Sequence, residues 1–238
     1  MTAVMSLLVG LTCLLSFLLA TPGTRAEEPN SSVSRKDRPP LRFEVRLGGH
    51  LAAKPLNLGY PGRLLVAIGK PGEGEPRFQA PHTGLRRGPL LGRDLQELKP
   101  GETAVLDRTS AIFPIEHLHQ LPPGTYAAQA LWHINRDLNF PNAPGDLYGP
   151  IQTFELDWSS PKTVSLELNQ SIPEETVPPD EGLVRYIKIR SQRLSEFHGR
   201  PIDLRAGIIL PRDYETQGDR RYPLRVHIGG LNSRYTRV

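Results

Sequence analysis

Short runs of alternating apolar and polar residues fill the chain between Leu41 and Leu168, and glycine and proline separate them. Alternation with a period of two is typical of β-strands that bury one face and leave the other in water. The first run, Leu41–Leu47, places four apolar side chains on one face and three charged ones on the other. No amphipathic helix pattern interrupts these runs. The segment is therefore limited to a mainly β fold.

The individual runs differ in how continuously apolar they are. Arg63–Ile68 is almost uninterrupted, as expected of a central strand. Tyr126–Ile134 alternates one row of side chains that contains Trp132 against another that contains Gln129, and we expect Trp132 in the core. The strands predicted from the pattern are Leu41–Leu47, Arg63–Ile68, Glu102–Leu106, Tyr126–Ile134, Ile151–Leu156 and Thr163–Leu168.

A proline-rich turn, Leu121–Thr125, leads directly into a strand that begins with Tyr126. It resembles the tyrosine corner of immunoglobulin-like sandwiches, in which the phenol is hydrogen-bonded to backbone a few residues upstream. Together with the short strands and Trp132, this turn predicts an Ig-like β-sandwich over residues 41–168.

The N-terminus has the pattern of a signal peptide. Residues 1–20 are mostly apolar, and the small residues Thr24 and Ala26 suit a cleavage point after residue 26. An uncleaved anchor is the alternative, but the apolar stretch within these residues is about as long as a signal-peptide core and shorter than the roughly 20 residues that a spanning helix needs. We therefore expect a secreted, periplasmic or cell-envelope protein with no stable membrane anchor after cleavage. Residues 27–40 are polar and proline-rich, which predicts a disordered leader.

Composition excludes several classes of site. Cys13 is the only cysteine and lies in the predicted signal peptide, so the mature chain has no disulfide, cysteine nucleophile or thiolate metal site. The formal net charge is +4, and the basic residues are scattered rather than gathered in a stripe. We expect no nucleic-acid partner.

One loop is rich in oxygen-bearing side chains. Residues 135–146 contain Asp137, Asn139, Asn142 and Asp146, which could hold Ca²⁺. Alternatively, these residue types are turn formers that link two strands. The order of the side chains matches no EF-hand spacing, so we predict no metal site and no cofactor.

The pattern changes after residue 168. Residues 169–182 are acidic, contain three prolines and lack strand periodicity, so they predict a linker. Apolar alternation then resumes, and we expect strands at Leu183–Ser191, Pro201–Leu210 and Tyr222–Ile228.

The residues from Leu183 to Asn232 resemble a known family. The order of Phe197–Pro201, Leu210-Pro211-x-x-Tyr214, Tyr222-Pro223 and Gly229-Gly230 is similar to the start of the esterase D / enterochelin-esterase-like branch of the α/β-hydrolases. Exported members of that group often carry an Ig-like domain before the hydrolase core. The resemblance implies that residues 183–238 begin a truncated α/β-hydrolase domain.

The resemblance also implies a position for the oxyanion hole, at Gly229, Gly230 and Leu231. Backbone N–H groups near Gly230 and Leu231 would be the donors, because glycine lets backbone approach a substrate oxygen closely. The sequence departs from the family in that Ile228 separates His227 from the glycines. A plain Gly-Gly turn is the alternative.

No G-x-S-x-G nucleophile elbow occurs in the sequence. In the α/β-hydrolase order the triad histidine follows the serine, so we interpret His198 and His227 as structural and assign no catalytic residue. The expected function is the N-terminal part of an exported serine carboxylic-ester hydrolase, inactive alone, whose complete form acts on a small ester. The alternative is a non-enzymatic exported β-sandwich with a binding or structural role. Either function leaves the oligomeric state open.

Overall fold

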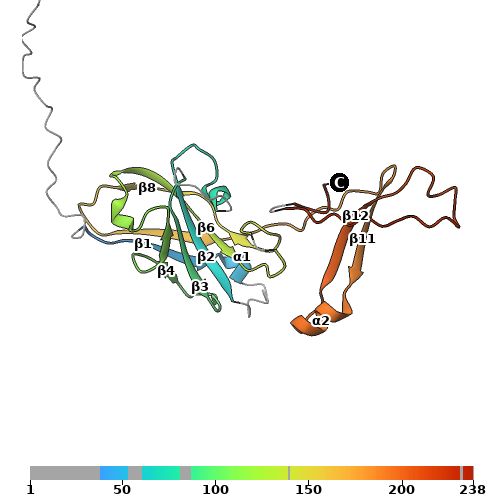
Figure 1. The fold of residues 1–238 in the computed structure, drawn as a ribbon. Coiled ribbons are helices and arrows are strands. Elements are labelled where there is room, and N and C mark those ends of the chain that lie inside the picture. The colour runs from blue at the N-terminus through green and yellow to red at the C-terminus, as the bar shows by residue number, and fades with distance from the viewer. Residues whose placement is uncertain (1–37, 53–60, 81–86, 139, 231–232, 238) are drawn as a thin grey trace, which may run out of the picture. The chain divides into compact units, whose positions relative to one another are not determined.

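The computed structural model describes residues 38–52, 61–80, 87–138, 140–230 and 233–237 (Figure 1). The predicted signal peptide and most of the predicted leader lie outside these ranges. The chain is mainly β, with several antiparallel and mixed sheets and only short helices. None of the helices in the described ranges is long and apolar enough to cross a membrane.

The first sheet has the strand order β4–β1–β9. Its central strand, β1 (Leu41–Leu47), has the bounds that the alternation predicts. It pairs antiparallel with β4 (Ala104–Leu106) and parallel with β9 (Lys162–Leu168). The first and last long strands of residues 41–168 therefore lie side by side.

The second sheet has the order β10–β7–β6–β2–β3–β5, and β8 also pairs with β6. All of its pairings are antiparallel. Its strands are β2 (Gly62–Gly69), β3 (Leu90–Leu95), β5 (Ala111–Phe113), β6 (Gly124–His133), β7 (Leu147–Tyr148), β8 (Gln152–Leu156) and β10 (Gln170–Ser171).

Both sheets contribute to one hydrophobic core. The alternating apolar side chains of β1 and β9 are buried on the face that the sequence predicts. Trp132 is fully buried, as expected. Phe43 of the first sheet meets Phe154 of the second edge to face, with 5.8 Å between ring centroids. Such contacts between β1 and β8 join the two sheets.

The predicted tyrosine corner is present. The Tyr126 hydroxyl donates a hydrogen bond to the carbonyl oxygen of Pro122 at 2.7 Å. The Tyr126 ring stacks on Phe154, with 5.7 Å between centroids, and burial raises the pKa of its phenol. Nearby, Trp158 Nε1 donates to the Leu121 carbonyl at 2.9 Å. These bonds hold the Leu121–Tyr126 turn at the start of β6.

The second face of β6 is also buried, which the alternation does not predict. Gln129 is buried although it lies on the face opposite Trp132. The 3-10 helix η2 (Pro76–Gln79) supplies part of the cover, because Arg77 N donates to Gln129 Oε1 at 3.1 Å. A second layer of loop therefore covers the central strand on the side away from the shared core.

The sequence pattern does not predict several other elements. They are β3, β5, β7 and β10, together with α1 (Gly49–Ala52) and η3 (Leu118–Gln120). β10 falls in the segment predicted as a linker, and it pairs with β7. β5, β7 and β10 have only two or three residues, which carry too little periodicity to recognise. β3 has six residues, but its sequence LLGRDL does not alternate between apolar and polar.

Residues 184–209 form a separate antiparallel hairpin of β11 (Val184–Arg190) and β12 (Asp203–Ile209), which confirms two predicted strands. The unpredicted helix α2 (Gln192–His198) connects them. Ser191 caps its first turn by accepting from Leu194 N, and Gly199 ends it in the left-handed conformation at φ 62°.

The third predicted strand, Tyr222–Ile228, is wrong for this structure, which has no strand there. The reason is the lack of a neighbour for its backbone. Among the described residues β12 pairs only with β11, and no strand pairs with Tyr222–Ile228.

Candidate functional site

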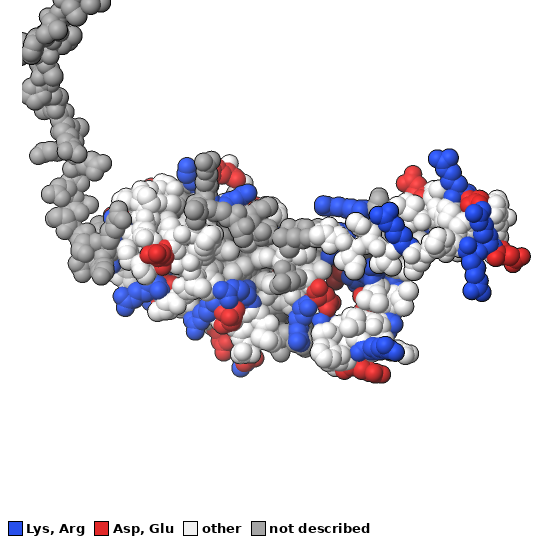
Figure 2. Space-filling view, in the orientation of Figure 1, with Lys and Arg blue, Asp and Glu red and all other residues white. Residues whose placement is uncertain are grey.

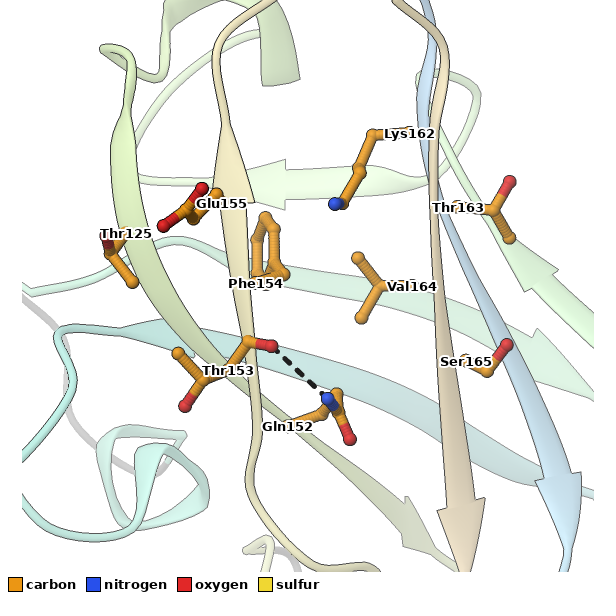
Figure 3. A pocket seen from close by; sticks show the side chains of 9 residues that line it. All are labelled: Thr125, Gln152, Thr153, Phe154, Glu155, Lys162, Thr163, Val164 and Ser165. Atoms are coloured by element: carbon orange, nitrogen blue, oxygen red, sulfur yellow. Dashed lines mark hydrogen bonds between the residues drawn. The ribbon is translucent and has the colours of Figure 1, made fainter.

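A cleft lies between β8 and β9, which are edge strands of different sheets. At one end the chain between β7 and β8 meets the end of β9: Asn169 N donates to the Tyr148 carbonyl at 3.1 Å, and Gly149 lies against the Glu167 carbonyl. Beyond that point β8 and β9 separate, and a space of about 500 Å³ opens between them (Figure 3). We call this space the β8–β9 gap.

The floor of the β8–β9 gap is apolar and its interior holds one ammonium group. Phe154 of β8 and Val164 of β9 are buried and project between the strands. Lys162 also projects between the strands, whereas Glu155 is directed toward Thr125 on the other side of β8 (Figure 3). Lys162 has no ion pair in the part of the chain that the structure describes.

The hydrogen bonds that anchor β9 show which of its backbone groups face the gap. Lys162 N donates to the Pro40 carbonyl at 2.9 Å, and Gly48 N donates to the Leu168 carbonyl at 2.8 Å. Residues 162 and 168 therefore direct their backbone toward β1, and in a regular strand every second residue does so. It follows that the N–H and C=O groups of Thr163 and Ser165 point away from β1, toward the gap.

The same reasoning applies to β8. Gly149 N donates to the Ala130 carbonyl at 3.1 Å, so the even-numbered residues of β6 face β7 and β8. In the β6–β8 register Tyr126 lies opposite Phe154. Because Tyr126 is even-numbered, its backbone groups face β8, so Tyr126 and Phe154 are hydrogen-bonded to each other through their backbones. The backbone groups of Thr153 and Glu155 therefore face the gap, and each of the two strands presents an unpaired edge to it.

This arrangement suits binding rather than catalysis. The residues that line the gap include hydroxyl side chains, one lysine and one glutamate, but no histidine and no cysteine. A nucleophile–base pair of the kind that activates a serine or cysteine is therefore not assembled at the gap. What the gap offers is a row of backbone donors and acceptors above an apolar floor.

The glycines predicted from the esterase resemblance lie elsewhere. Gly229 and Gly230 are exposed and belong to no strand, and Leu231 lies outside the described residues. Ser233 N donates to the Gly230 carbonyl at 3.0 Å, which closes a turn. A Cβ atom at Gly229 would lie 2.4 Å from Ser233 Cβ, so a larger residue there would displace the turn. The oxyanion-hole assignment stays a prediction.

The two histidines that the sequence analysis interprets as structural, His198 and His227, are exposed. His198 is the last residue of α2. Its ring lies edge-on to Phe197, with 5.0 Å between centroids. Neither His198 nor His227 is hydrogen-bonded to a carboxylate in the described ranges, so the structure does not bring them together with an acid.

The oxygen-rich loop is organised by a buried carboxylate. Asp146 accepts hydrogen bonds from the backbone N–H groups of Ile134, Asn135 and Ala143 at 2.9–3.0 Å. Its Oδ2 atom also lies 2.8 Å from His133 Nδ1. Asp146 thus serves the turn, and no group of three His, Cys, Asp or Glu side chains among the described residues is placed to hold a metal.

A buried arginine network was not predicted from the sequence. Arg77 lies between the rings of Phe78 and Tyr148, 4.1 and 4.0 Å from their centroids. It forms an ion pair with Glu75 at 2.6 Å and donates to Asn142 Oδ1 at 2.7 Å. The hydrogen bond from Arg77 is the main reason that the pKa of Glu75 lies below its ordinary value of 4.5. The network pins η2 to the sheet.

The surface mixes charges of both signs. Figure 2 shows basic side chains beside acidic ones on the visible face. Exposed ion pairs include Arg63 with Asp94 at 2.7 Å and Arg220 with Asp213 at 2.8 Å. The contacts of Arg77 with Asn142 and Tyr148 join residues far apart in the chain, so no local sequence signal could have indicated them.

Comparison with protein-family models, with curated proteins and with solved structures finds no match for this chain.

Proposed function

We propose that this chain is the N-terminal part of an exported serine carboxylic-ester hydrolase. In this proposal residues 41–168 are an Ig-like β-sandwich and residues 183–238 are the first part of an α/β-hydrolase domain. The nucleophile lies outside residues 1–238, because the sequence contains no G-x-S-x-G elbow. The substrate of the complete protein is a small ester.

The observation that carries the proposal is unpartnered apolar surface in the C-terminal part. The β11–β12 register pairs Ile187 with Ala206 and Ile189 with Leu204, so these side chains share one face of the hairpin. Ile189 and Leu204 are each more than half exposed. A two-stranded hairpin is marginally stable in water, and an apolar face of this kind needs a sheet or helix to cover it.

The next segment has the same property. Leu224, Val226 and Ile228 are 87%, 72% and 88% exposed. Their spacing of two residues suits a β-strand. Their high exposure shows that no neighbouring element covers them in this structure. Leu168 is the last buried residue among those described, so the apolar side chains of the hairpin and of this segment have no core of their own. A hydrolase sheet, covered by helices on both faces, would supply one.

The N-terminal part supports the proposal through its fold. Two sheets share one core, and the Tyr126–Pro122 hydrogen bond has the geometry of a tyrosine corner. Fold alone carries little functional information, so the esterase assignment rests on the C-terminal part.

The test begins with the reading frame beyond the codon for Val238. We expect it to encode a G-x-S-x-G elbow followed by an acid and a histidine. The complete protein should hydrolyse p-nitrophenyl acetate, and replacing the elbow serine with alanine should abolish turnover. The 238-residue chain without its signal peptide should show none. An uninterrupted frame without the elbow would overturn the proposal, as would serine-inhibitor-sensitive turnover by the 238-residue chain.

A non-enzymatic exported binding or structural module is the second candidate. The observation in its favour is that every buried residue among those described lies between Leu41 and Leu168, and so does the β8–β9 gap. If this candidate is correct, removal of residues 183–238 should leave the melting temperature of the remainder unchanged and preserve its function.

A further inference from the structure

We propose that the β8–β9 gap binds a short, extended, acidic peptide segment of a partner protein, which adds as a strand to the open edges of β8 and β9. This site lies within residues 125–165 and uses no residue of the proposed hydrolase part. The inference is therefore independent of the esterase proposal.

The opposite edge of the first sheet shows what a covered edge looks like in this protein. The backbone N–H and C=O groups of the even-numbered residues of β1 face β9, so those of Phe43 and Val45 are hydrogen-bonded to β4. In the β1–β4 register the backbone groups of Val105 therefore point away from β1, at the outer edge of the sheet. Arg93 of the second sheet donates to the Val105 carbonyl at 3.0 Å. The outward backbone carbonyl of that edge is therefore capped by a charged side chain, which is a common protection against strand addition.

The gap edge lacks this protection over its middle. In the described ranges no side chain is hydrogen-bonded to the backbone of Thr163, Ser165 or Glu155, and the Thr153 carbonyl accepts only from the adjacent Gln152 at 3.2 Å. No proline interrupts either strand. Main-chain donors and acceptors thus lie on both sides of one gap, and an extended peptide is the ligand whose own backbone matches them.

The β8–β9 gap is closed at both ends, which limits the length of a ligand. The chain between β7 and β8 meets the end of β9 at Gly149, and residues 157–161 connect the two strands at the other end, so only a short stretch of extended chain fits. The volume of about 500 Å³ is within the roughly 300–1,000 Å³ of ligand-binding clefts. Phe154 and Val164 provide an apolar surface for a side chain that points inward.

Charge defines the chemistry. Lys162 extends over this floor, and Glu155 is directed away from it (Figure 3). The pKa of Asp157, on the loop that connects the two strands, is lowered mainly by hydrogen bonds from Ser159, and Lys162 is close enough for its ammonium group to add to that lowering. Lys162 nevertheless forms no ion pair among the described residues, so a ligand carboxylate would complete a charge-assisted hydrogen bond. The favoured partner segment is therefore an extended one with an aspartate, a glutamate or a free C-terminus beside an apolar residue.

The first experiment selects binders from a phage-displayed library of random 12-residue peptides, with the chain from residue 27 to 238 as bait. We expect enriched sequences to contain an acidic residue next to an apolar one. Ser165→Pro removes an N–H that points into the gap and leaves the pairing with β1 intact, so it should fold. It should weaken an enriched peptide about tenfold or more, because strand addition loses a hydrogen bond and meets the ring. Val105→Pro, the matched control on the capped edge, should not change binding.

The second experiment tests the charge. Lys162→Glu should weaken the same peptide about tenfold or more and should shift a fresh selection from acidic to basic sequences. The affinity of Lys162→Gln for the peptide should lie between that of the original protein and that of Lys162→Glu. Peptides that bind Lys162→Glu as tightly as the original protein would overturn the assignment of the acidic ligand.

Hydrogen exchange gives a readout that does not depend on a variant folding. Saturation with an enriched peptide should slow exchange of the Thr163 and Ser165 amides but not that of Val164, which already bonds to β1. Protection elsewhere would place the peptide at another site and overturn the proposal. If no sequence is enriched, or if Ser165→Pro folds and binds the peptides unchanged, the gap is an ordinary sheet edge.

Discussion

Gly149 is the point at which the two sheets close, and its replacement tests the account of the fold most directly. A Cβ atom at Gly149 would lie 1.7 Å from the Glu167 carbonyl oxygen and 2.9 Å from its carbonyl carbon. These are backbone atoms, so no side-chain rotation can relieve the collision. Gly149→Ala must therefore push β9 away from the β7–β8 corner.

The expected cost combines two effects. Overpacking of a tight site costs about 1–3 kcal/mol. Displacement of β9 also strains the hydrogen bond from Asn169 N to the Tyr148 carbonyl, which is worth about 0.5–1.5 kcal/mol. Together they predict that Gly149→Ala lowers the free energy of unfolding by about 1.5–4.5 kcal/mol.

Urea denaturation followed by tryptophan fluorescence measures this cost. Gly49→Ala is the matched control, because nothing lies within 4 Å of a Cβ atom there. It should be neutral or slightly stabilising, since alanine is favoured over glycine in a helix by about 0.5–1 kcal/mol. If Gly149→Ala changes the unfolding free energy by less than about 0.5 kcal/mol, the corner is not closed as described.

Further predictions concern polar groups and the exposed C-terminal segment. Asp146→Ala should lower the free energy of unfolding by about 3–5 kcal/mol, because it leaves three backbone N–H groups without their acceptor; a loss below 1 kcal/mol would contradict this reading. Tyr126→Phe should cost about 0.5–1.5 kcal/mol in the same assay through loss of the bond to Pro122, and an unchanged value would mean that the corner contributes nothing. The pKa of Glu75 is lower in the folded state than its ordinary 4.5, so its stabilising contribution is present above that value and is lost as pH falls through the folded pKa. Thermal melts from pH 6 to pH 3 should therefore decline less steeply in Glu75→Gln than in the original protein. Replacing Leu224 and Ile228 with serine should reduce aggregation measured by light scattering and leave the melting temperature unchanged, since both side chains are exposed; a lower melting temperature would show that they are packed.

Prediction from sequence succeeded for long strands whose alternating side chains already indicate which face is apolar. β1 has the predicted bounds, and β11 and β12 differ from theirs by one or two residues. Tyr126 illustrates a second kind of success, because its hydrogen-bond partner is only four residues away. The proline-rich turn therefore contained both halves of the interaction.

Prediction failed where the outcome depends on a distant segment. Gln129 is polar and alternates with core residues, so the pattern predicts that it is exposed. It is buried because η2, more than fifty residues away in the sequence, covers it, and Arg77 N is hydrogen-bonded to its side chain. In contrast, Tyr222–Ile228 has a good strand pattern and forms no strand, because backbone pairing requires a neighbour. The Gly229 and Gly230 candidates follow that segment and lie in an exposed turn.

The sequence by itself determined that this is a mainly β protein, which residues of β1 and β9 face the core, and where Tyr126 anchors its turn. Side-chain alternation and short-range hydrogen bonds are local properties, so they can be read along the chain. Only the tertiary structure decided that β8 and β9 belong to different sheets, that Arg93 caps one sheet edge, and that Lys162 projects into the open one. Strand partners are chosen by packing between segments far apart in sequence, and the free edges that result are a property of the whole fold.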